Sequence, residues 1–318
     1  MDIVVCTDKG FIMPTGVLLY STCVNNPNTE ITFHIIIDES VGDKEKRELE
    51  ETVSIFRKNI LFYLADSSLL SAFPSLDNRQ DITVACYWRL MISEILPNSI
   101  PKVLYLDGDI IVRQSLMELW ETDISDCAIA AAPDYCDGAI EFFNRLKYSP
   151  QLGYFNSGVM LINLAYWREH NVISLFNQVL NERSNDIVYH DQDVLNMLFC
   201  KCKCTLPIKY NLSSGFLWDP PRYYYFKYEQ ELIEARQDPV IVHFSSEKPW
   251  YRHLRDGLHP FRSTWYLYQN QTRWKGILLN NRNNIKLILR VRYSLVDLLR
   301  KWRVIPYRYR YIGIAPID

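Results

Sequence analysis

Two aspartates one residue apart, Asp107 and Asp109, follow directly on the apolar run 103–106. Such a run is typical of a buried strand, and open α/β sheets bind ligands at the carboxyl ends of their strands. In an extended segment the side chains at i and i+2 point the same way, so both carboxylates can face one cation. Hard oxygen ligands suit Mg²⁺ or Mn²⁺, which also bind diphosphates. The alternative is an exposed Asp-Gly turn at Gly108, which the apolar residues on both sides disfavour.

His243 ends a second apolar run, at 239–242. Neutral imidazole is a good ligand for Mn²⁺ as well as for zinc. A histidine in such a place is more often a hydrogen-bonded residue of the core or of the sheet edge. The residues around His243 therefore leave both roles open.

Polar side chains interrupt apolar patterns at three further places. Asp191 and Gln192 lie in a His-Asp-Gln-Asp stretch before a helical pattern; one acidic residue would cap the helix, but the pair can also hold sugar hydroxyls. Asn156, in Phe-Asn-Ser-Gly before an apolar run, indicates a turn or a ligand-binding amide. Arg89, within the apolar segment 87–91, either lies along the surface or pairs with a phosphate or carboxylate.

The framework that positions these residues is predicted to be α/β, because short apolar runs alternate with helical patterns along the first two thirds of the chain. Strands are predicted at 3–6, 31–37, 61–64, 103–106, 128–132, 159–162 and 240–243. Helices are predicted at 16–25, 43–58, 87–96, 165–182 and 192–199. We expect one sheet with crossover helices, whose strand ends carry the polar residues.

Composition indicates a globular protein, with 48 % hydrophobic and 23 % charged residues among 318. No run approaches the roughly 18 apolar residues that span a bilayer, and the first residues lack the features of a signal peptide. We therefore expect a cytoplasmic protein whose eight cysteines are reduced thiols. Alternation of Cys200, Cys202 and Cys204 with lysines favours a strand with thiols on one face over a metal site.

The C-terminal region differs from the rest of the chain in charge. Residues 273–318 contain eleven lysines and arginines against two aspartates, whereas the whole chain has a net charge of −2. Within 288–305 six apolar residues recur at spacings of three and four, which predicts an amphipathic helix. This helix either packs on its own domain or lies on an anionic membrane surface, where basic and aromatic residues are favourable. RNA binding is a minor alternative.

Together these segments resemble glycosyltransferase family 8, whose relatives include bacterial lipopolysaccharide and lipooligosaccharide α-galactosyl- and α-glucosyltransferases and glycogenin. The resemblance covers roughly residues 1–265 and rests on seven short motifs in the family's order. They lie at 1–8, 87–90, 103–109, 155–163, 191–193, 206–211 and 243–250.

The resemblance implies a GT-A type domain over 1–265, with a Rossmann-like mixed sheet flanked by helices, and a helical basic C-terminal region over 266–318. It implies retaining, Mn²⁺-dependent transfer of galactose or glucose from a UDP-sugar to a glycan or lipid-linked saccharide, with Mg²⁺ as the alternative ion. The residues implicated are Asp107, Asp109 and His243 as metal ligands; Asp8 and Lys248 at UDP; Arg89, Asn156, Asp191 and Gln192 at the donor sugar; and Asp134 at the acceptor. An enzyme of lipopolysaccharide biosynthesis on the inner face of the membrane would fit this set.

The expected mechanism depends on which group lies below the sugar ring. The resemblance places Gln192 near the anomeric carbon, and because an amide is a poor nucleophile, front-face attack is favoured. Double displacement through Asp191 is the rival. Two other functions stay open: a metal-dependent nucleotidyltransferase, although Asp8-Lys9-Gly10-Phe11 is a poor phosphate loop, and a non-catalytic UDP-sugar-binding protein.

Overall fold

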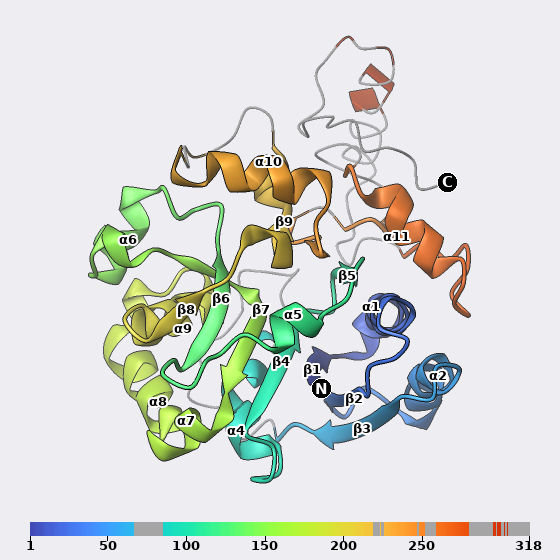
Figure 1. Ribbon diagram of the computed structural model, residues 1–318, viewed down its shortest axis with the longest axis horizontal. Helices are drawn as coiled ribbons and strands as arrows, with labels where there is room; N and C mark the ends of the chain where they lie inside the picture. The colour runs from blue at the N-terminus through green and yellow to red at the C-terminus, as the bar shows by residue number, and fades with distance from the viewer. Residues whose placement is uncertain are drawn as a thin grey trace.

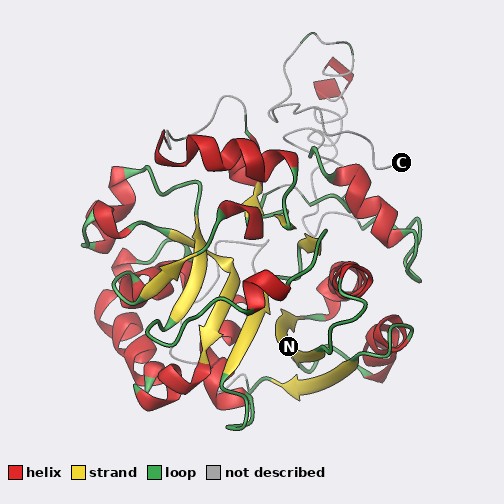
Figure 2. Ribbon diagram, viewed as in Figure 1, coloured by secondary structure: helices red, strands yellow, loops and turns green. Residues whose placement is uncertain are grey.

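The computed structural model describes residues 1–66, 85–218, 223, 226–246, 248–251 and 259–279, with six residues near the C-terminus (295, 296, 298, 299, 302 and 304). A seven-stranded sheet in the order β3-β2-β1-β4-β7-β6-β8 forms the centre of this part of the chain, and helices cover both of its faces (Figures 1 and 2). The α/β architecture predicted from the alternation of patterns is therefore confirmed.

The N-terminal half of the sheet is parallel. Its strands are β1 (Asp2–Thr7), β2 (Thr32–Ile37), β3 (Asn59–Leu64) and β4 (Lys102–Leu106). Ile3 and Val5 of β1 belong to one core cluster, and Val4 and Cys6 belong to the cluster on the other face. Because β1 is buried on both faces, its sequence is a continuous apolar run without polar alternation.

The other half of the sheet contains antiparallel pairs. Here β7 (Phe155–Asn163) pairs antiparallel with both β4 and β6 (Ile129–Pro133), and β8 (Lys203–Thr205) joins β6 in parallel. β7 begins at Phe155 and includes Asn156 and Gly158, so these residues belong to the strand itself and not to a preceding turn. The sheet is mixed, as expected.

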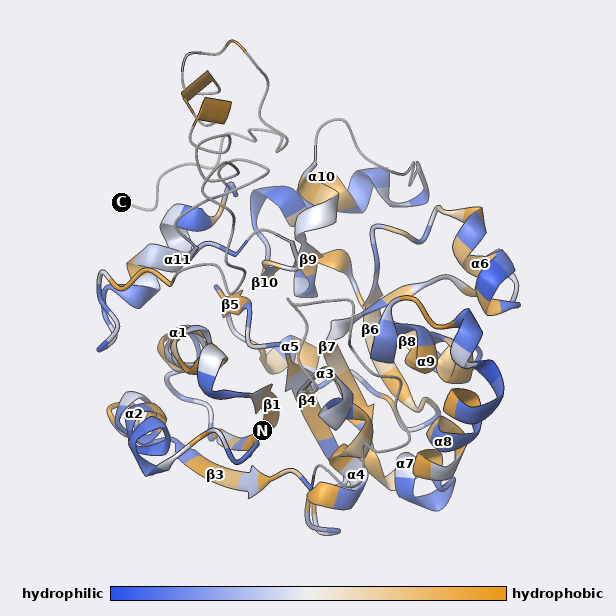
Figure 3. Cartoon of the chain, turned by 180° about the vertical axis from the view of Figure 1, so that it is seen from behind, coloured by the Kyte–Doolittle hydropathy of each residue, from blue (hydrophilic) through white to orange (hydrophobic). Residues whose placement is uncertain are grey.

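The two faces of the sheet carry different helices. The face formed by Ile3 and Val5 packs against α1 (Ile12–Asn25) and the amphipathic α2 (Asp43–Ser54), whose outer side is polar in Figure 3. The opposite face packs against α7 (Leu164–Glu169), α8 (Val172–Arg183) and α9 (His190–Phe199). Further helices in the described part of the chain are α3 (Ala85–Trp88), α4 (Ile92–Ile95), α5 (Met117–Trp120), α6 (Ile140–Leu146), α10 (Glu229–Gln237) and α11 (Arg262–Gln269).

Two predicted helices are divided in the structure. The predicted helix 165–182 breaks into α7 and α8 at Asn171, which has a left-handed φ of 46° that interrupts a right-handed helix. The predicted helix 87–96 is instead α3 and α4 joined by a 3-10 turn at Arg89–Met91. The apolar periodicity continues through both segments and carries no information about such backbone breaks.

A second, three-stranded sheet brings distant segments together. Its strands are β5 (Ile110–Val112), β10 (Ile241–His243) and β9 (Leu212–Ser213), in the order β5-β10-β9. The antiparallel register of β10 with β5 pairs His243 with Ile110, and parallel pairing with β9 sets His243 beside Ser213. Since β5 begins directly after Asp109, this register delivers His243 to the two aspartates.

The expectation that all cysteines are reduced is wrong for two of them. Cys127 and Cys204 form a disulfide across the parallel pair β6–β8, with their Cα atoms 6.0 Å apart. The predicted thiol-bearing strand at 200–204 shortens to β8, because Cys200 and Cys202 lie in the turn after α9. Among the described residues, five other cysteines form no disulfide, as predicted: Cys6, Cys23, Cys136, Cys200 and Cys202.

The C-terminal region is described only in part. α11 packs against α1, and the indole of Trp274 occupies the space above Gly16, where an added Cβ would lie 2.0 Å from the ring. The predicted amphipathic helix 288–305 falls largely outside the described residues. Among the helices that the structure does describe, none has the length and apolar character needed to cross a bilayer.

Candidate active site

Asp107, Asp109 and His243 converge at the carboxyl end of β4. His243 Nε2 lies 3.3 Å from Asp109 Oδ1 and 3.7 Å from Asp107 Oδ2, and one ligand atom from each residue lies within 4.8 Å of the others. His243 and Asp109 are buried, whereas Asp107 is partly exposed. Two carboxylates and an imidazole at this spacing form a donor set that a divalent cation could share.

Gly158 makes this convergence possible. A Cβ at this position would lie 2.3 Å from His243 Cε1 and 2.8 Å from Asp107 Oδ2, which is closer than real side chains approach. The strand cannot withdraw, because the Gly158 carbonyl accepts a 2.8 Å hydrogen bond from the Asp107 amide. The sequence around Gly158 indicates a turn or a ligand-binding amide, but the need for glycine there follows only from the packing.

Two oxygens of Asp107 face different partners. Oδ1 accepts hydrogen bonds from Arg89 Nη2 at 2.8 Å and from the Tyr105 hydroxyl at 2.7 Å, whereas Oδ2 faces His243. The Arg89 guanidinium also lies over the Tyr105 ring, 4.7 Å from its centroid. Arg89 is 6 % exposed, so it is an interior residue and not a surface arginine. Because Arg89 binds Oδ1 of Asp107, the other carboxylate oxygen, Oδ2, can still bind a cation.

Arg89 also binds Asp191, so that it bridges the cation cluster and the start of α9. Its Nε lies 3.1 Å from Asp191 Oδ2, which also accepts a hydrogen bond from Ser157 Oγ at 3.1 Å. Burial raises the pKa of Asp191 to about 6, although Arg89 acts in the opposite direction. The carboxylate is thus a restrained group whose ionisation lies near neutral pH.

Gln192 presents a fixed amide. Its Oε1 accepts a hydrogen bond from the Ser157 amide at 3.1 Å, and its Nε2 donates to the Tyr154 hydroxyl at 3.1 Å and to Asp134 Oδ2 at 3.4 Å. Asp193, the last residue of the tetrapeptide, has a different role: it is fully buried and binds Arg145 at 2.6 Å. The first turn of α9 therefore divides into a site-facing pair and a structural anchor.

Asp109 is surrounded by positive charge. Lys248 Nζ forms an ion pair with Asp109 Oδ2 and also donates to the Phe244 carbonyl at 2.7 Å. Burial acts to raise the pKa of Asp109, but Lys248 and His243 outweigh it and hold this pKa well below its usual range. The carboxylate is consequently ionised at neutral pH and available as a ligand.

Asp8 lies at the end of β1, the strand adjacent to β4. Its Oδ1 accepts a 2.7 Å hydrogen bond from the Gly10 amide, which caps the 3-10 turn Lys9–Phe11. Phe11 of that turn covers Gly108, since a Cβ on Gly108 would lie 3.2 Å from the Phe11 ring. The segment carrying Asp8 therefore borders the cation cluster.

Asp134 and Asn156 pair at a neighbouring point of the site. Asn156 Nδ2 donates to Asp134 Oδ2 at 2.8 Å, and Asn156 Oδ1 accepts from the Gly158 amide at 3.0 Å and from Asn211 Nδ2 at 2.8 Å. Burial raises the pKa of Asp134, with Asn156 opposing it. Asn211 was part of a motif in the sequence but was assigned no role there.

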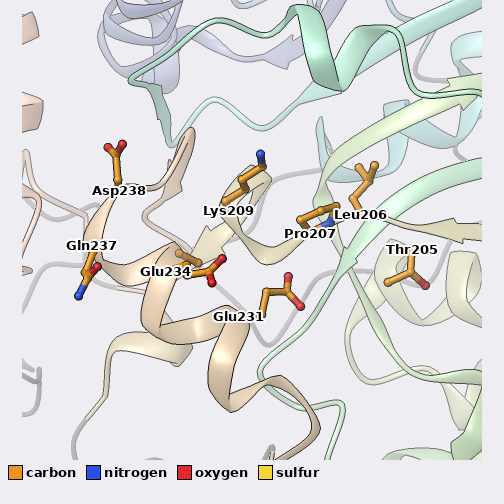
Figure 4. A pocket seen from close by; sticks show the side chains of 9 residues that line it. Thr205, Leu206, Pro207, Lys209, Glu231, Glu234, Gln237 and Asp238 are labelled. Carbon is orange, nitrogen blue, oxygen red and sulfur yellow. The ribbon is translucent and has the colours of Figure 1, made fainter.

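A hollow of about 640 Å³ lies away from this cluster, between the segment after β8 and α10 (Figure 4). None of its lining residues belongs to the predicted site. They are Thr205, Leu206, Pro207, Lys209, Glu231, Glu234, Ala235, Gln237 and Asp238.

Comparison with known proteins identifies the class. The galactosyltransferase LgtC, solved in complex with donor and acceptor sugar analogs, superimposes with a TM-score of 0.75 at 25 % identity, covering 86 % of this chain and 96 % of that chain. The fold is therefore the GT-A type of glycosyltransferases, as predicted. The bifunctional glycosyltransferase WbbM shares this fold, with a TM-score of 0.69 over 86 % of this chain and 50 % of that one, at 20 % identity.

The chain belongs to glycosyltransferase family 8, whose sequence pattern matches residues 2–253. The lipopolysaccharide glucosyltransferase WaaO of Escherichia coli is 30 % identical over 311 residues, 95 % of this chain and 86 % of the relative. General stress protein A of Bacillus subtilis is 28 % identical over 281 residues, 87 % of this chain and 96 % of the relative. The lipopolysaccharide 1,3-galactosyltransferase of Salmonella typhimurium is 28 % identical over 287 residues, 86 % of this chain and 79 % of the relative. The protein is thus a glycosyltransferase, and the nucleotidyltransferase alternative is set aside.

Proposed function

We propose that the protein transfers glucose or galactose from a UDP-sugar to a glycan or lipid-linked saccharide, with retention of the anomeric configuration. The observation that carries this proposal is the convergence of Asp107, Asp109 and His243 beside a lysine and next to the Arg89–Asp191 pair. A cation site adjoining groups suited to a sugar is what transfer from a nucleotide diphosphate sugar requires.

Asp107, Asp109 and His243 are the proposed ligands of the cation. They fit such an ion because two carboxylates supply hard oxygens and the imidazole adds a nitrogen, a combination that suits Mn²⁺ better than Mg²⁺. When bound, the ion would act as a Lewis acid on the departing diphosphate. The Asp107 oxygen held by Arg89 and Tyr105 fixes the carboxylate so that its other oxygen faces the site.

Lys248 and Asp8 are proposed to hold UDP. The contact of Lys248 with Asp109 supports a role for its ammonium in binding a diphosphate oxygen beside the cation and in stabilising the charge of the leaving group. Removing one such preorganised contact typically costs about 100- to 1,000-fold in rate. Asp8, after β1, is proposed to contact the uracil end.

Gln192 and Asp191 are proposed to act at the donor sugar, together with Arg89 and Asn156. Gln192 holds its amide in one orientation through Ser157 and Tyr154, so its oxygen can support positive charge at the anomeric carbon without forming a bond. Asp191 Oδ2 is engaged by Arg89 and Ser157, which restrains it from attack.

These restraints favour front-face transfer. The acceptor oxygen bonds to the anomeric carbon on the face that the diphosphate leaves, the carbon–oxygen bond to the phosphate breaks, and the departing phosphate takes the acceptor's proton. The rival is double displacement through Asp191. Mass spectrometry of protein quenched with donor alone distinguishes the two, since a sugar adduct on Asp191 would replace the front-face mechanism with the rival.

Asp134 is proposed to border the acceptor site, where its carboxylate could accept hydrogen bonds from a saccharide hydroxyl. Two relatives are named as lipopolysaccharide transferases, which supports a role in lipopolysaccharide biosynthesis. The catalytic domain is proposed to span 1–265.

The basic segment 273–318 of the C-terminal region is proposed to bind an anionic membrane surface at the cytoplasmic face. In a flotation experiment, vesicles containing an anionic phospholipid should carry the whole chain with them. A chain ending at residue 272 should not float with these vesicles. Equal flotation of the two would refute the membrane role.

The function itself is tested by measuring UDP release from UDP-glucose and UDP-galactose, with Mn²⁺ or Mg²⁺ and a panel of saccharide acceptors. We expect release that depends on the metal and is abolished in Asp109→Asn. A wild-type protein that binds UDP-sugars but never releases UDP would instead be a non-catalytic sugar-nucleotide-binding protein.

A further inference from the structure

Four buried polar side chains form a continuous hydrogen-bonded chain behind the proposed cation site. The chain runs Asp134–Asn156–Asn211–His243, with contacts of 2.8, 2.8 and 3.0 Å in that order. All four residues are at most 6 % exposed, and Asn211 is fully buried. This series of hydrogen bonds crosses from the seven-stranded sheet to the three-stranded sheet, since Asn156 lies in β7 and His243 ends β10.

The direction of every hydrogen bond in this chain follows from one backbone group. The Gly158 amide can only donate, so the Asn156 atom 3.0 Å from it is the oxygen, and Asn156 Nδ2 must face Asp134. The Asn211 atom that meets the Asn156 oxygen must then be a donor, Nδ2. Asn211 Oδ1 is left facing His243 Nδ1, which must carry a hydrogen.

We propose that Asn211 is the positioning residue that holds His243 in its Nδ1–H tautomer and thereby presents an unprotonated Nε2 to the cation. This inference rests on the proposed function. The other tautomer would carry a hydrogen on Nε2, which lies 3.3 Å from Asp109 Oδ1 and could bond to that oxygen. A hydrogen bond from His243 to Asp109 would engage the ligand atoms of both residues and make them unavailable to the cation. Asn211 therefore keeps the ligand set open.

Metal-binding histidines generally require a partner for their second nitrogen, and loss of such a partner typically costs about 10- to 100-fold in metal affinity. Here the partner is an amide whose own orientation is set by Asn156 and Gly158. Asn156 is thereby assigned a second role besides the donor sugar, because both of its polar atoms are used inside the protein.

The test measures Mn²⁺ binding directly, by electron paramagnetic resonance of the free ion, in wild type and Asn211→Ala. We expect the dissociation constant to rise about 10- to 100-fold in the variant. The matched control is Asn26→Ala, which also removes a buried amide with two firm hydrogen bonds. Asn26 donates to Thr22 O at 2.9 Å and accepts from Leu116 N at 2.8 Å, and neither bond involves a proposed metal ligand. Asn26→Ala should bind Mn²⁺ within about twofold of wild type.

Equal Mn²⁺ affinity of Asn211→Ala and wild type would overturn the inference, and so would an equal loss in both variants. A second measurement needs no Asn211 variant: ¹⁵N spectra of histidine-labelled, metal-free wild type at pH 8.5, with the His243 signals assigned against His243→Gln. These spectra should show the Nδ1–H form, and an Nε2–H form would refute the proposal. Wild type that shows the expected tautomer but binds no Mn²⁺ would instead refute the proposed function.

Discussion

Replacing Gly158 with alanine adds a single methyl group between two proposed metal ligands. The new Cβ would lie 2.3 Å from His243 Cε1, whereas an ordinary carbon–carbon contact is about 3.6 Å, so the ring must move by roughly 1.3 Å. The backbone cannot provide this movement, because Gly158 is bonded to Asp107 through its carbonyl and to Asn156 through its amide. The side chains must therefore move: His243 most, and also Asp107, whose Oδ2 would lie 2.8 Å from the new Cβ.

A shift of this size should separate His243 from the two aspartates. A misplacement of about 1 Å commonly costs about 100-fold in rate, and we expect at least this loss in kcat/KM for UDP release by Gly158→Ala. Mn²⁺ affinity should fall about 10- to 100-fold. Overpacking of the interior should lower the free energy of unfolding by only about 1–3 kcal/mol, so the protein should stay folded.

The assay compares Mn²⁺ affinity, UDP release and thermal unfolding in wild type, Gly158→Ala and the control Gly42→Ala. Gly42 has an ordinary φ of −89°, and a Cβ there would meet only the flexible end of Glu45, at 3.3 Å. The control should behave as wild type in metal binding and turnover. Normal Mn²⁺ affinity and turnover in Gly158→Ala would show that the three side chains do not share an ion.

Three further predictions test separate parts of the site and fold. Lys248→Met should lower kcat by about 100- to 1,000-fold, and the variant should stay folded in the absence of UDP. An unchanged kcat would exclude Lys248 from the leaving-group site. Burial raises the pKa of Asp191 from 3.8 to about 6, so the folded state holds this proton more tightly than the unfolded chain does. The free energy of unfolding should therefore fall as pH rises from about 4 to about 6. Chemical denaturation of EDTA-treated protein across this range should show that slope in wild type and a smaller one in Asp191→Asn; identical slopes would contradict the assignment. Cys204→Ser opens a loop with a sequence separation of 77 and should lower the free energy of unfolding of the oxidised protein by about 4.5 kcal/mol. This difference should vanish when both proteins are reduced.

Local patterns predicted most of the strands because a buried strand requires a short run of apolar residues wherever it lies in the sheet. β1, β2, β4 and β10 all lie within a residue or two of their predicted bounds. The same patterns failed at Asn171, where the helix breaks, since the apolar period continues across the break while the backbone does not. They also failed at Cys127 and Cys204, which meet only because β8 pairs with β6.

The sequence by itself determined the pair Asp107 and Asp109 at a strand end, because both their spacing and the strand before them are local properties. The residues around His243 left its role open, and only the family resemblance suggested it as a third ligand. The register of β10 against β5, across more than a hundred residues of chain, brings it to the two aspartates. The tertiary structure also decided that Gly158 must lack a side chain and that Asn211 faces the histidine ring. Contacts of this kind arise from how sheets are registered and packed, and no neighbour along the chain carries that information.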